Sequence, residues 1–177
     1  MEKIVVILCA QRKNGTSIQI QKYLEQKNKE ISFITLYDKD VQPCCHCMRC
    51  SVIGKCSKYK DNFYQIVCEV EQATTIIVIS PLYTMIPSKI TAFFERLSNI
   101  TYLAKHECIL KNKKIGVIGY DSKGISYRLI ELLKEIMLPI ANSFRDNEKF
   151  DFLIHHKQQE QQYKNIFEML DDILEEV

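Results

Sequence analysis

The sequence lacks the features that would indicate a nucleic-acid or membrane partner. Lysine and arginine number 24 against 22 acidic residues, and no long basic run occurs, so nucleic acid is not an expected partner. The apolar run at residues 4–10 is too short for a membrane span and is flanked wrongly for a signal peptide. We therefore expect no membrane partner and a cytoplasmic protein.

Two common nucleotide-binding motifs are also missing. No G-x-G occurs in the chain, which excludes a dinucleotide fingerprint. Gly119 and Gly124 have the spacing of a nucleotide-triphosphate loop, but Ile125 follows where that loop needs lysine. The chain also has no internal repeat, low-complexity segment or linker. At 177 residues it is expected to form a single domain, residues 1–177.

What the chain does contain is an alternation of apolar strands and amphipathic helices. The expected strands are residues 4–8, 31–37, 74–79, 114–118 and 140–144. The expected helices are residues 18–28, 61–73, 88–101, 125–138 and 163–176, the fourth being stopped by Pro139. This alternation predicts an α/β, flavodoxin-like doubly wound sheet of five parallel strands, order 2-1-3-4-5, with helices on both faces. Residues 150–154 form an unassigned apolar patch, a candidate for an added short strand.

Five of the eight cysteines lie in one cysteine-rich loop, at about residues 38–60. Cys44, Cys47, Cys50 and Cys56 follow the spacing C-x2-C-x2-C-x5-C, and Cys45 is an extra thiol. Compact spacing of this kind is typical of thiolates around a [4Fe-4S] cluster, whereas zinc usually takes paired C-x2-C knuckles set further apart. Zinc, or a loop of reduced thiols without metal, remains an open alternative.

Three loops should meet at the carboxyl edge of the sheet, where open α/β sheets bind ligands. The first loop carries Arg12, Asn14, Thr16 and Ser17 at the start of a helix, an arrangement that suits a phosphate group. An ordinary polar helix cap would have the same residues.

The second and third loops offer aromatic surface. The second loop provides Pro81, Leu82, Tyr83, Thr84 and Met85, which suit a flat heteroaromatic ring, although they could simply pack inward. The third loop provides Gly119, Tyr120, Asp121 and Gly124.

These motifs together resemble those of the NADPH-dependent FMN reductase family. The segment CAQRKNGTS is similar to the family's phosphate loop, G-S-P-R-x-N-G-N-T, and ISPLYTMIPSKITAFFER is similar to its second loop and following helix. The cysteine run lies where the iron-sulfur flavoprotein branch carries C-x2-C-x2-C-x4-7-C. The resemblance covers roughly residues 3–124, with Cys9, Ala10 and Gln11 departing from the usual Gly-Ser-Pro.

The resemblance implies a role for each of these segments. Arg12, Asn14, Thr16 and Ser17 would hold the phosphate of FMN, residues 81–85 would line the ring with Tyr83 nearest, and residues 119–124 would close the other side. Cys44, Cys47, Cys50 and Cys56 would hold a [4Fe-4S] cluster. No catalytic residue is expected, because the flavin carries the chemistry. Glu95 and Arg96 are expected to stabilise their helix rather than to do chemistry.

We therefore predict an FMN-dependent oxidoreductase of the iron-sulfur flavoprotein type, with the cysteine loop as an electron port beside the flavin or a lid over it. The alternatives are an NAD(P)H-dependent FMN or quinone reductase without a cluster, and a thiol- or metal-responsive sensor that binds no flavin. NAD(P)H is a possible donor, and a small molecule or a protein could donate or accept electrons. The family resemblance also implies a homo-oligomer.

Overall fold

The computed structural model describes residues 2–9, 15–27, 29–103, 110, 112–142, 151–152 and 165–177. The strands are β1 (Ile4–Leu8), β2 (Ile31–Thr35), β3 (Thr75–Pro81), β4 (Lys114–Asp121), β5 (Gly124–Ile125) and β6 (Asp151–Phe152). The α-helices are α1 (Thr16–Glu25), α2 (Arg49–Ile53), α3 (Phe63–Glu71), α4 (Ser88–Leu103), α5 (Tyr127–Asn142) and α6 (Ile166–Glu175), and η1 (Leu36–Asp38) is a short 3-10 helix. None of the helices in these ranges is long and apolar enough to cross a membrane.

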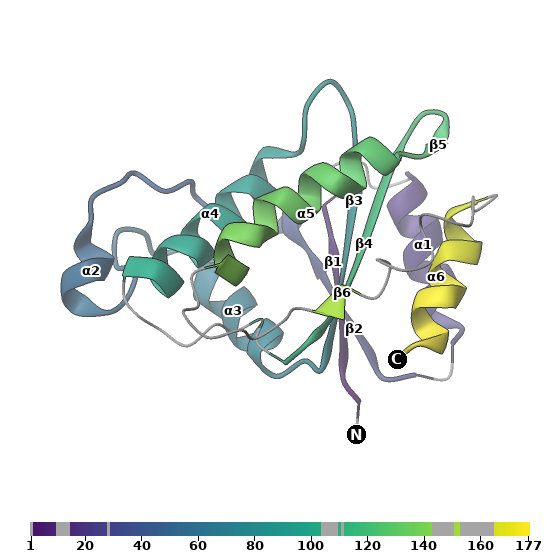
Figure 1. Cartoon of the computed structure of the whole chain (residues 1–177), viewed down its shortest axis with the longest axis horizontal. Helices are drawn as coiled ribbons and strands as arrows, with labels where there is room; N and C mark the ends of the chain where they lie inside the picture. Colours follow the sequence, from purple (N-terminus) through teal and green to yellow (C-terminus); the bar gives the residue numbers. More distant parts are fainter. Residues whose placement is uncertain are drawn as a thin grey trace.

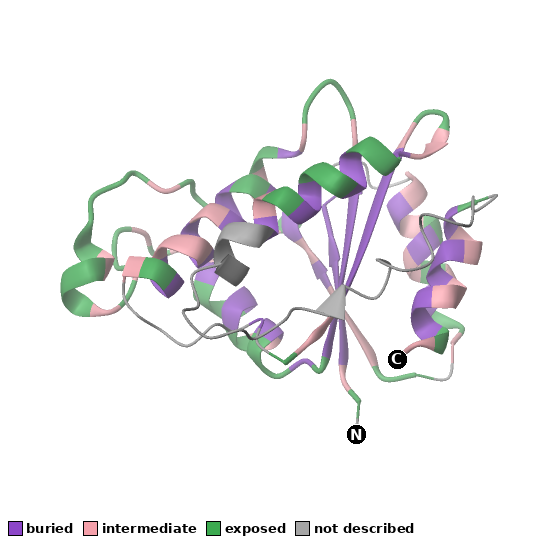
Figure 2. Cartoon of the chain, in the orientation of Figure 1, coloured by how far each residue is buried: buried purple, intermediate pink, exposed green. Residues whose placement is uncertain are grey.

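The sheet runs in the order β2-β1-β3-β4, all parallel, with β6 parallel to β4 and β5 antiparallel to its end. Helices α1 and α6 cover one face, and α3, α4 and α5 cover the other (Figure 1). All residues of β1 and β3 are buried, as expected of β-branched strands covered on both faces (Figure 2). The flavodoxin-like fold class and the strand order are confirmed.

The position of the fifth parallel strand differs from the prediction. Residues 140–142, expected to begin that strand, continue α5 instead, and 143–144 lie outside the described residues. The strand β6 lies within the unassigned patch at residues 150–154. Helix α5 passes through Pro139, so this residue does not stop the helix as the sequence predicted.

Two glycines of β4 let helices approach the sheet. A Cβ at Gly119 would lie 2.9 Å from Leu129 Cβ and 3.0 Å from the backbone nitrogen of Ile130 in α5. A Cβ at Gly116 would lie 3.2 Å from the end of the Ile173 side chain in α6. A side chain at Gly119 should therefore be tolerated less well than one at Gly116, because the backbone of α5 cannot move aside as a side chain can.

Candidate functional site

A cavity of about 420 Å³ lies at the carboxyl ends of β1, β3 and β4, where the sequence predicts a ligand site. We call it the edge pocket. Its lining residues come from all three expected loops: Gly15, Thr16, Ser17, Pro81, Leu82, Tyr83, Tyr120, Asp121 and Ser122. Segments more than 100 positions apart in the sequence thus form one wall.

The first part of that wall is the N-terminus of helix α1. Gly15 is the N-cap residue and has no side chain to cap the helix, and no acidic residue lies in the first turn. The N–H groups of a first helical turn lack intrahelical partners and carry partial positive charge. An uncapped helix start without a competing carboxylate is suited to bind an anion.

The second part of the wall is aromatic. The backbone N–H of Leu82 donates to the carbonyl of Tyr120 at 2.6 Å, which fastens the loop after β3 to the end of β4. Burial, together with nearby Tyr83, raises the pKa of Tyr120 to about 12, while a hydrogen bond with Ser17 acts in the opposite direction. Tyr120 is therefore a neutral phenol at ordinary pH, whereas Tyr83 is 44% exposed at the pocket mouth.

The structure brings together most, but not all, of the predicted site residues. Seven of them line the edge pocket: Thr16, Ser17, Pro81, Leu82, Tyr83, Tyr120 and Asp121. Four others, Thr84, Met85, Gly119 and Gly124, are described but do not line it. Arg12 and Asn14 lie outside the described residues. Ser122 was predicted only as part of the range 119–124, and Gly15 was not predicted as a site residue, although it lies in the predicted phosphate loop.

Gly119 needs a different explanation from the one predicted. It is buried inside β4, where its carbonyl accepts a hydrogen bond from Ser126 N at 2.8 Å and its missing side chain leaves room for α5. Gly124 has a φ of 121°, a conformation that favours glycine, and it turns the chain back into β5.

A second cavity, of about 30 Å³, lies at the cysteine-rich loop, and we call it the cysteine cavity. Its lining includes all five cysteines of the segment, Cys44, Cys45, Cys47, Cys50 and Cys56. Helix α4 provides the opposite wall with Arg96, Asn99, Ile100 and Leu103. Cysteines spread over 13 positions of sequence therefore line one small cavity.

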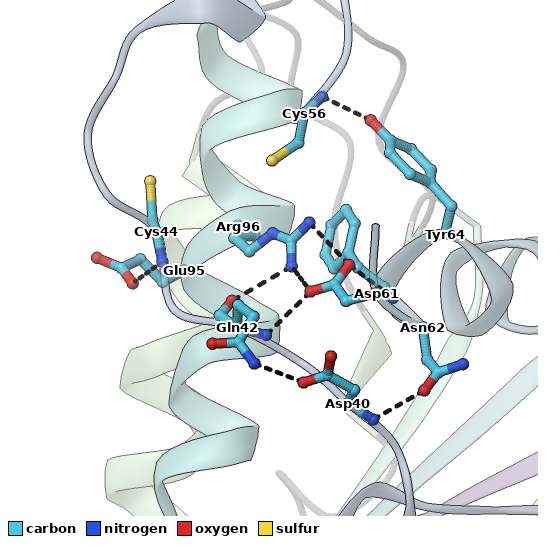
Figure 3. A network of polar contacts seen from close by, with 10 residues as sticks. Asp40, Gln42, Cys44, Cys56, Asp61, Asn62, Tyr64, Glu95 and Arg96 are labelled. Carbon is cyan, nitrogen blue, oxygen red and sulfur yellow. Dashed lines mark hydrogen bonds and ion pairs between the residues drawn. The ribbon is translucent and has the colours of Figure 1, made fainter. Parts of the chain in front are cut away.

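The cysteine-rich loop is closed at its base by paired hydrogen bonds, which we call the neck. Asp40 N donates to Asn62 Oδ1 and Asn62 N donates to the carbonyl of Asp40, both at 2.8 Å. Gln42 N donates to Asp61 Oδ2 at 3.0 Å (Figure 3). The neck holds the two ends of the cysteine-rich loop together, so the segment between them is a loop whose ends lie close to each other.

Inside the loop the backbone turns sharply. His46 and Met48 have φ values of 49° and 56°, a left-handed conformation uncommon for residues other than glycine, and Gly54 follows at 73°. Burial raises the pKa of the Cys44 thiol, although the His46 N–H that reaches its sulfur opposes the shift. Among the described residues, no three Cys, His, Asp or Glu side chains already form a metal-binding group.

Glu95 and Arg96 also contact the cysteine-rich loop and its neck, a role that the prediction of helix stabilisation did not include. Glu95 accepts a hydrogen bond from Cys44 N at 3.2 Å and lies 3.2 Å from His46 Nε2. Arg96 forms an ion pair with Asp61 in the neck. Both residues therefore fasten the cysteine-rich loop to α4.

The two cavities are separate. They share no lining residue, and the cysteine cavity lies against the last two turns of α4, whereas Tyr83 of the edge pocket precedes the start of that helix. From Ser88 to Asn99 the helix rises about 16 Å. Within one chain, the cysteines therefore neither cover the edge pocket nor lie immediately beside it. This arrangement differs from the prediction, in which the cysteine-rich loop lies beside the flavin or over it.

Comparisons with known proteins agree with this geometry. The family model described as NADPH-dependent FMN reductase matches residues 2–147. Among curated proteins, none matches the chain significantly.

Several solved structures share the fold at low sequence identity. The flavoenzyme NAD(P)H:(acceptor) oxidoreductase FerB from Paracoccus denitrificans is 16% identical, with a TM-score of 0.55 over 77% of this chain and 72% of its own. RosB, solved with a riboflavin-phosphate derivative, is 12% identical, with a TM-score of 0.61 over 97% and 76%. An NADPH-quinone reductase from P. pentosaceus is 12% identical, with a TM-score of 0.58 over 100% and 98%.

These structures support the fold, and the family match covers most of the sequence. The chain belongs to the NADPH-dependent FMN reductase family and is an FMN-dependent oxidoreductase.

Proposed function

We propose that this oxidoreductase binds FMN in the edge pocket, takes electrons from NAD(P)H there, and releases them through a [4Fe-4S] centre held by Cys44, Cys47, Cys50 and Cys56. One observation carries the finer part of the proposal. The four cysteines of the C-x2-C-x2-C-x5-C motif line a single cavity together with a buried arginine. A sensor that binds no flavin is set aside, because the family is one of FMN-dependent enzymes.

The residues of the edge pocket fit FMN. The uncapped start of α1, with Thr16 and Ser17, would bind the phosphate, and the predicted Arg12 and Asn14 would join it from the adjoining loop. Pro81, Leu82 and Tyr83 would lie along the ring. Tyr120 stays protonated, so it adds no negative charge to a pocket that must hold an anion.

Residues at the pocket mouth would exclude water and receive the donor. Tyr83 is 44% exposed and Met85 is 76% exposed, so both present surface on which a ring system that enters from solvent can pack. We propose that Thr84 and Met85 contribute in this way, although they do not line the pocket itself. Bound FMN supplies the hydride and one-electron chemistry, and this chain supplies position and shielding.

The cysteine cavity fits a cluster by its donor set, since four cysteines line it and Arg96 can offset negative charge. A [4Fe-4S] cluster would supply single-electron transfer when bound. The second candidate is a reductase without a cluster. It is favoured by the finding that no metal-binding group is already formed in the described part of the chain.

The test is anaerobic reconstitution followed by analysis of flavin, iron and sulfide. The proposal predicts one FMN and about four irons per chain. The double variant Cys47→Ser/Cys50→Ser should lose the iron and keep FMN, whereas Cys68→Ser on α3, outside the cavity, should keep both. A wild-type protein that binds FMN but no iron would establish the reductase without a cluster.

We also propose a homo-oligomer, in which a second copy covers the exposed mouth of the edge pocket. The exposure of Tyr83 and Met85 supports this proposal. Light scattering on the FMN-loaded protein tests it, and a monomer at micromolar concentration would contradict it.

A further inference from the structure

Arg96 is a buried cation that the flavin chemistry does not use. Its side chain is 1% exposed, and it lies on the half of α4 that is remote from the edge pocket. Nη1 donates to the carbonyl of Gln42 at 3.2 Å and pairs with Asp61, and Nη2 lies 3.3 Å from Asp61 Oδ1 (Figure 3). The guanidinium also lies over the ring of Phe63, at 4.1 Å from its centroid. Arg96 thus contacts both segments of the neck, one at Gln42 and the other at Asp61.

None of these contacts uses Nε of Arg96. The Nε atom is buried and has no hydrogen-bond partner. An unsatisfied buried donor is costly and uncommon, so its position on the wall of the cysteine cavity is informative. Asp61, by contrast, also accepts from Gln42 N and Phe63 N, so its own charge is already well satisfied.

The sulfur of Cys56 interacts with this cation. Figure 3 shows the Cys56 thiol beside the guanidinium, with Cys56 N donating to Tyr64 Oη at 2.7 Å. Burial acts to lower the pKa of Arg96, but Asp61 and the Cys56 thiol more than offset it, so that the pKa is raised. The side chain therefore stays charged at the cavity wall.

Asn99 provides a second donor from the same helix, three residues further on. Its Nδ2 lies 3.5 Å from Cys44 Sγ and 3.1 Å from the carbonyl of Glu95. Residues three apart share one face of a helix, so Arg96 and Asn99 present their polar groups to the same cavity. Polar groups on one side of α4 thus contact the first and the last cysteine of the motif.

We propose that Arg96 and Asn99 are the positioning residues of the thiol centre. Arg96 directs positive charge to Cys56, Asn99 donates to Cys44, and together they set how readily the centre accepts electrons. The inference rests on the proposed function in taking the four cysteines as one centre. Hydrogen bonds to ligand sulfurs and nearby charge are the means by which proteins adjust such centres.

The test needs a variant that folds without the cation. In Arg96→Met/Asp61→Asn both charges of the buried pair are lost together, which avoids leaving one of them unpaired and leaves the net charge unchanged. Arg96→Lys keeps the charge without the fork, and Asn99→Ala removes the second donor. Far-UV circular dichroism and FMN binding should be unchanged in all three.

The readout on the metal-free protein is the ratio of alkylation rates by iodoacetate and iodoacetamide at each cysteine, followed by mass spectrometry. Both reagents attack the same thiolate, so the ratio cancels its population and reports the local charge. Arg96→Met/Asp61→Asn should lower the ratio at Cys56 by about threefold. Arg96→Lys should keep the wild-type ratio at Cys56, and the ratio at exposed Cys68 should be the same in all variants.

The readout on the reconstituted protein is the midpoint potential of the iron centre. Loss of the cation or of the Asn99 donor should shift this potential to more negative values, with Arg96→Lys intermediate. An unchanged ratio at Cys56, or an equal fall at Cys68, would overturn the role of Arg96, and an unshifted potential in Asn99→Ala would overturn that of Asn99. If the wild-type protein takes up no iron, the cluster fails as a proposal, while the alkylation ratio at Cys56 still decides the role of Arg96. The absolute rate at which iodoacetamide alkylates Cys44, compared between wild type and Asn99→Ala, then decides the role of Asn99, and an unchanged rate would overturn it.

Discussion

The edge pocket and the cysteine cavity are built in different ways. The edge pocket is formed where parallel strands end, by a helix start and by the loops that follow the strands, so the fold itself creates it. The cysteine cavity lies outside the sheet and is formed by side chains of a loop against one helix. A shared family fold therefore accounts for the first cavity, whereas the second depends on individual side chains of this sequence.

Helix α4 is the element common to both. It begins just after the loop that carries Tyr83, and its later turns hold the neck and the cysteines. Lys89, near its start, donates to the carbonyls of Tyr37 and Lys39 at 2.6 and 2.5 Å, which fixes the beginning of the cysteine-rich loop. A change in the neck should therefore affect the cysteine cavity first and the edge pocket only through α4.

The largest expected effect comes from breaking the neck. Asp61→Asn leaves the charge of Arg96 buried without a counterion and should lower the free energy of unfolding by about 3–5 kcal/mol. Adding Arg96→Met to this variant should restore much of the loss, because the uncompensated charge is removed. Urea unfolding followed by circular dichroism measures both.

The matched control is Asp171→Asn, which removes the same charge from an exposed pair. Asp171 lies 2.7 Å from Lys27 and is 42% exposed, so we expect a loss of at most about 1 kcal/mol. Equal losses at Asp61 and Asp171 would contradict the importance of the neck.

A second, smaller effect should appear beneath the edge pocket. Gly119→Ala places a methyl group 2.9 Å from Leu129 and 3.0 Å from the backbone of Ile130, so β4 and α5 must separate. We expect a loss of about 1–3 kcal/mol and weaker FMN binding, because Tyr120 follows directly in the strand. Thermal unfolding and flavin fluorescence measure the two effects.

Gly116→Ala is the companion variant, since only the flexible end of Ile173 lies near, at 3.2 Å. It should cost less than Gly119→Ala and leave FMN affinity unaltered. If Gly116→Ala lost FMN binding while Gly119→Ala kept it, the close approach of α5 at Gly119 would not explain FMN affinity.

The elements of the edge pocket were predictable because their signals are local. The runs at residues 4–8 and 74–79 are apolar and β-branched, and they form the buried strands β1 and β3. The third loop was less well placed, because β4 continues three residues beyond the expected 114–118 and carries Tyr120 to the pocket within the strand. Strand ends depend on pairing with neighbours, which a single sequence does not display.

The cysteine cavity could be predicted only in part. The spacing of the cysteines identified the segment, but Arg96 contacts Asp61 across 35 positions and Asn99 contacts Cys44 across 55. Contacts between distant side chains leave no periodic pattern in the sequence. For the same reason, the helical signal around Glu95 and Arg96 was assigned to helix stability.

The pH dependence of stability should distinguish the edge pocket from the neck. The pKa of Tyr120 is raised from 10.0 to about 12 in the folded chain, so its neutral form is favoured by folding. That contribution is complete below pH 10.0 and is lost as pH rises toward about 12, at up to about 1.4 kcal/mol per pH unit. Tyr120→Phe should remove this alkaline component when unfolding is measured across that range.

The ionisation of Asp61 gives a pH dependence of stability with the opposite sign. Although burial acts to raise it, the hydrogen bond from Arg96 and those from the backbone keep the pKa of Asp61 below 3.8, so its contribution is present above pH 3.8 and is lost as pH falls through the folded value. Tyr120→Phe should leave this acid limb unaltered. A change in the acid limb of Tyr120→Phe would mean that the two sites are not energetically separate.

The smallest effect expected is on ligand affinity alone. Thr16→Ala removes a hydroxyl from the start of α1 and should weaken FMN binding by about tenfold, the value of one hydrogen bond to a charged group. Gln19→Ala, an exposed position on the same helix, is the control and should bind FMN normally. Iron content should be the same in both, because the cysteine cavity shares no residue with the edge pocket. Flavin titration with parallel iron analysis checks this expectation, and a joint loss of FMN and iron in Thr16→Ala would show that the two cavities fold as one unit.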